Sequence, residues 1–254
     1  MITVHLIEQD LSSLTASIES DVDVVVCDPP FAIGGPKRVE RLYNRKKDAL
    51  VGGYNETTSP ETLYRSLTTH AAVALKPTGL GVFISGWTHY HTLRNAVDAS
   101  SLTLINELVF PFSFGVYSPR RFVTSHYTGA LVERSPGRGR IARHHLSANK
   151  QKPYSPDVIP FRREYRRGVP RYVNTLSVDL TRKLAWHLIP DGSRVVDLCA
   201  GACGFARGIL ATPDIKSGEV WCYDNNPGVL SLAEQTLRQD ANQHGKALSI
   251  IRGR

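Results

Sequence analysis

Two turns that follow apolar strands carry the residues with the most specific chemistry in this 254-residue chain. The first is Asp28-Pro29-Pro30-Phe31, directly after the β-branched run DVVVC. Prolines stiffen a turn and fix the direction of its carbonyl groups. The Asp28 carboxylate and the Pro29 carbonyl could then accept both hydrogens of an amino group, while Phe31 offers a stacking face for an extruded base. Such acceptors would free the lone pair of an aromatic amine for attack on a methyl sulfonium. The alternative is an ordinary proline turn that ends a strand.

The second turn is rich in glycine and reads Asp197-Leu198-Cys199-Ala200-Gly201-Ala202-Cys203-Gly204, between an apolar strand and a helix. Glycine allows a ligand to approach the backbone closely, and a helix start presents free N–H groups. A third turn, Asp224-Asn225-Asn226-Pro227, follows the strand EVWCY. An acid at the end of the next strand is well placed to accept hydrogen bonds from ribose hydroxyls. Each turn alone could be structural, but together they predict a nucleoside pocket.

The elements that must position these turns alternate along the chain. Apolar patterns predict strands at 3–7, 23–27, 81–85, 102–110, 124–133, 194–198, 219–223 and 247–251, and helices at 12–18, 59–75, 88–98, 178–188, from about 205, and 228–238. Strands 102–110 and 124–133 should form an antiparallel pair. The alternation favours a doubly wound, mostly parallel α/β sheet with helices on both faces and ligands at the carboxyl ends of the strands.

The net charge of +8 is concentrated in two stretches. Residues 134–171 hold eleven Lys or Arg and only two acids, and residues 36–47 hold six Lys or Arg against Glu40. Positive surface of this kind attracts polyanions through phosphate neutralisation. A solvated basic loop that serves solubility is the alternative. The four cysteines are too few for a disulfide framework and lack companion ligands for a zinc site, so we expect buried, inert thiols and no bound metal.

The runs VHLIEQD, DVVVCDPPF, ALKPTGLGVFISG, SRVVDLCAGACGF and WCYDNNP, in this order, resemble the amino-group DNA methyltransferases of the β-class arrangement. In that family the catalytic D-P-P-Y/F motif precedes the glycine-rich cofactor motif, and the target-recognition region lies between them. The resemblance covers most of the chain except roughly 134–175. It implies a Rossmann-like methyltransferase fold with a seven-stranded-type sheet and a small basic insertion.

The resemblance also implies roles for individual residues. Asp28, Pro29, Pro30 and Phe31 would hold and stack the target base. S-adenosyl-L-methionine would be held by Asp10, Asp197, Cys199, Gly201, Gly204, Asp224 and Asn225. Asp197, Gly201 and Gly204 would line its methionine side, Asp224 would bind its ribose, and Asp10 would approach its adenine.

The chain departs from the family pattern at two places. Cys203 stands where a second glycine is usual, and LSVDLT replaces the H-P-T-Q-K-P-like signature. Moreover, either terminal strand, 3–7 or 247–251, could lie beside the strand that ends at Asp224. Asp10 keeps its role only if that neighbour is 3–7.

The resemblance predicts methyl transfer to the exocyclic amino group of a flipped base in double-stranded DNA. D-P-P favours adenine N6. Cytosine N4, RNA adenine and a catalytically silent DNA-binding relative are the alternatives. The catalytic domain would comprise 1–133 and 174–254, with target recognition at 134–173 and DNA contacts from 36–47 and 134–171. A homodimer and a restriction endonuclease partner are both compatible with this prediction. Without an N-terminal signal or an apolar run of membrane-spanning length, we expect a cytoplasmic protein of prokaryotic or viral origin.

Overall fold

A computed structural model of the chain describes residues 1–30, 59–113, 119, 122, 124–143, 155–162 and 176–253. Its elements are, in chain order, β1 (Ile2–Glu8), β2 (Val22–Cys27), α2 (Pro60–Ala74), β3 (Leu75–Ser85), α3 (Tyr90–Asp98), β4 (Thr103–Pro111), β5 (His126–Glu133), α4 (Val178–Leu188), β6 (Arg194–Asp197), α5 (Gly204–Leu210), β7 (Gly218–Asp224), α6 (Pro227–Gln243) and β8 (Leu248–Gly253). The alternation of strands and helices expected from the sequence is confirmed.

All eight strands form one sheet, in the order β4-β5-β3-β2-β6-β7-β1-β8. Only β5 is antiparallel, to β3 on one side and to β4 on the other. The remaining pairs are parallel, so β1, β2, β6 and β7 all end at the same side of the sheet. The eight strands are those that the apolar patterns predict. Because β8 continues the ladder beyond β1, the sheet has one strand more than the seven-stranded type that the resemblance implies.

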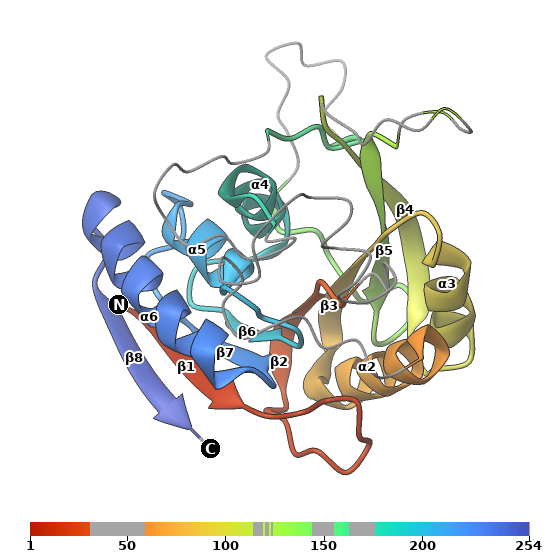
Figure 1. The fold of residues 1–254 in the computed structure, drawn as a ribbon, viewed down its shortest axis with the longest axis horizontal. Helices are drawn as coiled ribbons and strands as arrows, with labels where there is room; N and C mark the ends of the chain where they lie inside the picture. Colours follow the sequence, from red (N-terminus) through yellow and green to blue (C-terminus); the bar gives the residue numbers. More distant parts are fainter. Residues whose placement is uncertain are drawn as a thin grey trace.

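Helices cover both faces of this sheet (Figure 1). Helices α4, α5 and α6 pack on one face, where Leu180, Phe205 and Leu237 meet the strand residues Val4 and Val26. Helices α2 and α3 pack on the other face, mainly against β2, β3, β4 and β5. Because β2 is buried on both faces, its sequence is nearly continuous in apolar β-branched residues rather than alternating. The doubly wound architecture is therefore the observed one.

The helix expected at 12–18 is wrong, because residues 11–20 form turns and irregular backbone. Short polar side chains satisfy the backbone locally in this stretch. The Asp10 carboxylate accepts from the Ser12 amide at 2.8 Å, and the Ser13 hydroxyl accepts from the Thr15 amide at 3.3 Å. Such bonds compete with helical hydrogen bonding, which is why Ser, Thr and Asp favour turns. The segment crosses from β1 to β2 as a loop.

The described parts of the basic stretch 134–171 pack on the core. Backbone bonds join residues 157–161 to the outer side of β4: the Val109 amide donates to Asp157 O at 2.9 Å, and the Ile159 amide donates to Val109 O at 2.8 Å. The Arg143 guanidinium donates to Trp186 O and Ile189 O at the end of α4, at 2.8 and 2.9 Å. Residues 144–154 and 163–175 lie outside the described residues.

No helix in the described part of the chain is long and apolar enough to cross a membrane.

Candidate active site

Strands β2 and β6 bring the two chemically distinctive turns together. The two strands are parallel neighbours in which Val26 pairs with Asp197, and the Leu198 amide donates to Val26 O at 3.0 Å. Each turn directly follows its strand, so Asp28 and the glycine-containing turn leave the sheet side by side at its carboxyl end. The sequence separates these residues widely, but the sheet order makes them neighbours.

Asp28 carries a carboxylate oxygen that is shut off from solvent. Its Oδ1 atom is buried and has no hydrogen-bond partner among the described residues. Burial, and after it the charge of Asp197, raise the pKa of Asp28 well above the ordinary value. Pro29 is buried beside it and Pro30 is exposed, whereas Phe31 lies outside the described residues.

Asp197 repeats this arrangement at the end of β6. The residue is 1% exposed, and its Oδ1 atom has no partner within the described chain. Burial raises the pKa of Asp197 to about 8, against the lowering effect of a hydrogen bond from the Cys199 backbone amide. Burying a carboxylate is costly unless a partner compensates it. Two neighbouring carboxylates with unpartnered oxygens therefore favour a ligand that brings positive charge or hydrogen-bond donors.

The turn between Leu198 and Gly204 leaves space for a ligand at its glycine. Gly201 has a φ of +51°, and a side chain there would point into open space, with no atom within 4 Å. A second left-handed residue, Cys203, has a φ of 55° just before α5. Cys203 occupies the position at which the amino-group DNA methyltransferases that the sequence resembles usually have a glycine. Its side chain is fully buried and interacts with Cys222 in the core beneath α5, so it does not occupy the open side of the turn.

Asp224 supports this turn from the end of β7. Its Oδ2 accepts from the Gly201 amide at 2.8 Å, and its Oδ1 accepts from the Asn226 amide at 2.9 Å. Burial raises its pKa, although these two backbone hydrogen bonds act in the opposite direction. Asn225, predicted to bind the cofactor, follows Asp224, and the neighbouring Asn226 is the residue that caps α6. A carboxylate oxygen can accept more than one hydrogen bond, so Asp224 keeps acceptor capacity for a ligand.

Strand β1, and not β8, lies next to β7. Glu8 pairs with Asp224, and the Gln9 amide donates to Asp224 O at 3.0 Å. The alternative in which 247–251 flanks the Asp224 strand is therefore wrong, because β8 pairs with β1. Asp10 is exposed and follows β1 on the same side of the sheet as Asp224.

Tyr64 belongs to the surroundings of this site, although the sequence pattern places it among the core residues of a helix. It is 1% exposed, and its hydroxyl forms a 2.9 Å hydrogen bond with the hydroxyl of Ser85 at the end of β3. Burial raises its pKa, opposed by the Ser85 hydrogen bond and reinforced by the nearby Cys27 and Asp28. The sequence indicates only that Tyr64 falls at an apolar position of the helix, and it does not show that its hydroxyl meets Ser85.

The three acids Asp28, Asp197 and Asp224, of which Asp197 is fully buried and the other two are partly buried, follow consecutive strands in the order β2-β6-β7. None of them forms an ion pair with a described basic side chain. No group of three or more His, Cys, Asp or Glu side chains in the described residues is arranged to hold a metal ion. The arrangement thus suits an organic cation with hydrogen-bond donors beside an open glycine.

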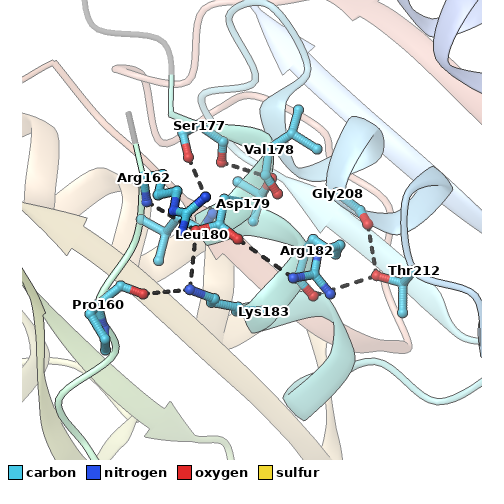
Figure 2. A network of polar contacts seen from close by, with 11 residues as sticks. Pro160, Arg162, Ser177, Val178, Asp179, Leu180, Arg182, Lys183, Gly208 and Thr212 are labelled. Carbon is cyan, nitrogen blue, oxygen red and sulfur yellow. Dashed lines mark hydrogen bonds and ion pairs between the residues drawn. The ribbon is translucent and has the colours of Figure 1, made fainter. Parts of the chain in front are cut away.

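The basic run 36–47 lies outside the described residues. Residues 155–162 belong to the other basic stretch, and Asp179 at the start of α4 joins them to that helix (Figure 2). Its Oδ2 accepts from the Arg162 amide at 3.0 Å and from Lys183 Nζ at 3.1 Å, and Lys183 Nζ also donates to Pro160 O at 2.6 Å. Phe161 packs against Phe112 and Tyr127, so it contributes to the core rather than to an exposed stacking surface.

Neither the family models nor the curated proteins compared with this sequence give a match. Solved structures do match it at the level of fold. M1.HpyAVI in complex with SAM shares 11% identity over 86% of this chain and 89% of its own, with a TM-score of 0.59. A Thermus thermophilus protein assigned as a DNA modification methylase, complexed with S-adenosyl-L-methionine, shares 15% identity over 98% of both chains, with a TM-score of 0.62. The PvuII DNA methyltransferase, specific for cytosine N4, shares 13% identity over 94% and 92%, with a TM-score of 0.61. The chain therefore has the Rossmann-like fold of these DNA methyltransferase structures, over nearly its whole length.

Proposed function

We propose that this chain is an S-adenosyl-L-methionine-dependent methyltransferase that modifies the exocyclic amino group of a flipped DNA base, with adenine N6 as the favoured target. One observation carries the proposal. Asp28 and the Gly201 turn lie on neighbouring strands at the carboxyl end of the sheet, and Asp28 and Asp197 each hold a buried oxygen without a partner in the described chain. The fold shared with DNA methyltransferase structures supports the same conclusion.

The residues of the site fit the cofactor in charge and in shape. Asp197 would face its positively charged methionine portion, and Gly201, which has open space above it, would allow it to approach the backbone. Asp224 would accept from the ribose hydroxyls while it keeps the turn in place, and Asp10 would lie near the adenine. Cys199, Gly204 and Asn225 complete the two turns and would contribute backbone contacts.

The target amine would be held by Asp28 and Pro29. S-adenosyl-L-methionine supplies a methyl group bonded to a sulfonium. The Asp28 carboxylate and the Pro29 carbonyl would each accept one N–H of the base, which concentrates the nitrogen lone pair toward the methyl carbon. Transfer would form the nitrogen–carbon bond as the carbon–sulfur bond breaks, and the amine would give one proton to the Asp28 carboxylate. Because burial raises its pKa, Asp28 is a stronger proton acceptor than an ordinary aspartate.

The distribution of basic residues supports DNA, a polyanion, as the substrate. The excess of Lys and Arg lies in 36–47 and 134–171, outside the turns that form the site. We propose 134–173 as the target-recognition segment, joined to the catalytic domain (1–133 and 174–254) where residues 155–162 pack on β4 and α4. The D-P-P sequence favours adenine, while the likeness to a cytosine-N4 enzyme keeps that base as the alternative.

Transfer of a tritiated methyl group to unmodified DNA tests the proposal. Wild type should label DNA, and Asp28→Ala and Asp28→Asn should not. Asp98→Asn, which alters an exposed carboxylate on α3, should retain activity and serves as the control. Digestion of the product to nucleosides should yield N6-methyladenine, and N4-methylcytosine would identify the alternative.

A parallel reaction with RNA distinguishes the nucleic acid. Preferential labelling of RNA would overturn the DNA assignment while retaining the chemistry. Calorimetric titration with S-adenosyl-L-methionine separates an inactive relative from an active enzyme. If Asp28→Ala labels DNA as well as wild type does, the catalytic assignment is wrong.

A further inference from the structure

Two polar side chains of α2 are buried among apolar residues of the same helix. Ser66 is 2% exposed and His70 is 4% exposed, and the two residues lie one helical turn apart. Leu67 and Ala71, which follow them in the sequence, belong to the hydrophobic core. A buried polar group costs free energy unless a hydrogen bond compensates it. The partners of Ser66 and His70 therefore indicate what these residues do.

Both side chains hold the loop that joins β1 to β2, residues 9–21. The Ser66 hydroxyl donates to Leu11 O at 2.7 Å. His70 Nε2 forms a 2.9 Å hydrogen bond with Ser13 O. Because a carbonyl oxygen can only accept, the Nε2 atom carries the hydrogen and donates it. Helix α2 thus fixes two neighbouring carbonyl groups of a loop that has no helical hydrogen bonds of its own to order it.

The carbonyl that Ser66 holds belongs to the peptide group that orients Asp10. The Ser12 amide donates to Asp10 Oδ1 at 2.8 Å. This amide and Leu11 O are the two ends of one planar peptide group. A chain of hydrogen bonds therefore runs from the Ser66 hydroxyl, through that peptide group, to the Asp10 carboxylate. A rotation of the peptide plane that breaks the Ser66 bond also moves the donor that orients Asp10.

The same loop flanks the turns of the candidate cofactor site. The Gln9 amide donates to Asp224 O at 3.0 Å. Leu11 is 5% exposed and belongs to the same core cluster as Leu198, which directly follows β6. Asp10 lies between these two attachments and is itself exposed. A carboxylate has two acceptor oxygens, so with Oδ1 held by Ser12 the other oxygen is available to a ligand.

We propose that Ser66 and His70 are positioning residues, which hold Asp10 where its carboxylate accepts from the exocyclic amino group of the cofactor's adenine. This inference rests on the proposed function and deepens it, because it assigns recognition of the cofactor's base to buried residues of α2 outside the ligand-binding turns. Neither residue touches the cofactor. An amino group donates to a carboxylate, whereas a carbonyl at the same ring position would set one acceptor against another.

The test compares the binding of two ligands by calorimetry. One is S-adenosyl-L-homocysteine, and the other is S-inosyl-L-homocysteine, which has a carbonyl in place of the adenine amino group. Wild type should bind the adenosyl ligand at least about tenfold more tightly, which is the discrimination that one hydrogen bond to a charged group supplies. Ser66→Ala and His70→Leu should weaken binding of the adenosyl ligand about three- to tenfold and of the inosyl ligand less than about twofold. A merely structural role would weaken both alike.

Thr68→Val provides the matched control. Thr68 is 1% exposed on the same helix, and its shortest hydrogen bond runs to Tyr64 O within α2 rather than to the loop. This variant loses a buried hydroxyl and should still discriminate between the ligands as wild type does. His70→Gln keeps an N–H donor at the end of the side chain and should restore most of the discrimination that His70→Leu loses. If His70→Leu does not fold, Ser66→Ala carries the test with the same controls.

A double variant separates action through Asp10 from an independent effect. Asp10→Ala should itself remove most of the discrimination, and Ser66→Ala added to it should cause no further loss, because Ser66 acts through Asp10. The positioning role is overturned if the two losses add, if Ser66→Ala weakens both ligands equally, or if it weakens neither. Equal binding of both ligands by wild type also overturns it and leaves the proposed function intact. If wild type binds neither ligand, the proposed function itself fails.

Discussion

The carboxylate of Asp224 accepts a 2.8 Å hydrogen bond from the backbone amide of Gly201. An acid at the end of β7 thereby holds the glycine turn that follows β6, and the same carboxylate accepts from the Asn226 amide at the start of α6. Both hydrogen bonds are partly buried, so replacing Asp224 leaves these backbone donors short of partners.

Asp224→Ala should therefore affect both stability and ligand binding. Loss of the partner of a buried donor costs about 1–3 kcal/mol, which denaturant unfolding measures. Calorimetry should show weaker binding of S-adenosyl-L-methionine. Asp224→Asn keeps one acceptor oxygen and should lose less of both. Equal binding by Asp224→Ala and wild type would show that this residue does not support the cofactor site.

Asp197 should make the stability of the ligand-free protein fall as pH rises. Its pKa is about 8 in the folded protein against 3.8 for an ordinary aspartate, so between these values the folded protein holds a proton that the unfolded chain has lost. The resulting stabilisation is complete below pH 4 and is lost as pH rises through about 8. Unfolding measured at pH 5, 6.5 and 8 should show this decline, and Asp197→Asn should flatten it. A profile that is unchanged in the variant would contradict the assignment to Asp197.

Cofactor binding should release protons at neutral pH. A cation beside Asp197 favours its charged form and lowers its pKa, so the carboxyl group must lose its proton as the ligand binds. Calorimetry in buffers of different ionisation enthalpy measures this release directly. Wild type should release protons at pH 7 and Asp197→Asn should release fewer. Proton uptake by wild type would show that the ligand does not place positive charge near this site.

Cys203 should tolerate glycine better than alanine. The residue has a φ of 55°, which strains any residue with a β-carbon by roughly 1–2 kcal/mol. Both substitutions remove the buried sulfur, but only glycine also removes the strain. Cys203→Gly should therefore be about 1 kcal/mol more stable than Cys203→Ala in denaturant unfolding. Since the side chain lies in the core, both variants should bind S-adenosyl-L-methionine with nearly wild-type affinity. A large loss of affinity in Cys203→Gly would show that the sulfur reaches the ligand.

Most of the sheet could be predicted because hydrophobic patterns are local. DVVVC indicates a strand buried on both faces, and Ser59-Pro60 indicates a helix start, which the Ser59 cap confirms. Short polar stretches are less informative, since Ser12 and Ser13 can bond the backbone in a turn as well as occupy a helix. The helix expected at 12–18 failed for this reason.

The neighbours of each strand depend on contacts between distant residues, which no local pattern contains. The position of β1 between β7 and β8 decides whether Asp10 lies near Asp224, and the sequence allowed both arrangements. Tyr64 was missed for a similar reason: its hydroxyl finds Ser85 only when α2 packs on β3. A parallel sheet, by contrast, brings strand ends to one side, so the sequence could place Asp28 and the glycine turn at the same end of the sheet. That their strands are neighbours is known only from the strand order.

The final prediction concerns Asp179, which joins the segment 155–162 to α4 (Figure 2). Burial is the largest single effect on Asp179 and raises its pKa. The hydrogen bonds from the Arg162 amide and from Lys183, together with the charges of Lys183 and Arg182, outweigh burial, so the pKa of Asp179 is lowered. Asp179→Ala should release this attachment and raise KM for DNA several-fold, while KM for S-adenosyl-L-methionine stays constant. Glu234→Ala removes an equally ion-paired carboxylate from α6 and should change neither constant. A rise in both KM values would mean that Asp179 supports the fold as a whole. A rise for DNA alone means that residues 155–162 position the recognition segment, since the hydrogen bonds of the Asp179 side chain go to Arg162, Arg182 and Lys183 and to no residue of the cofactor turns.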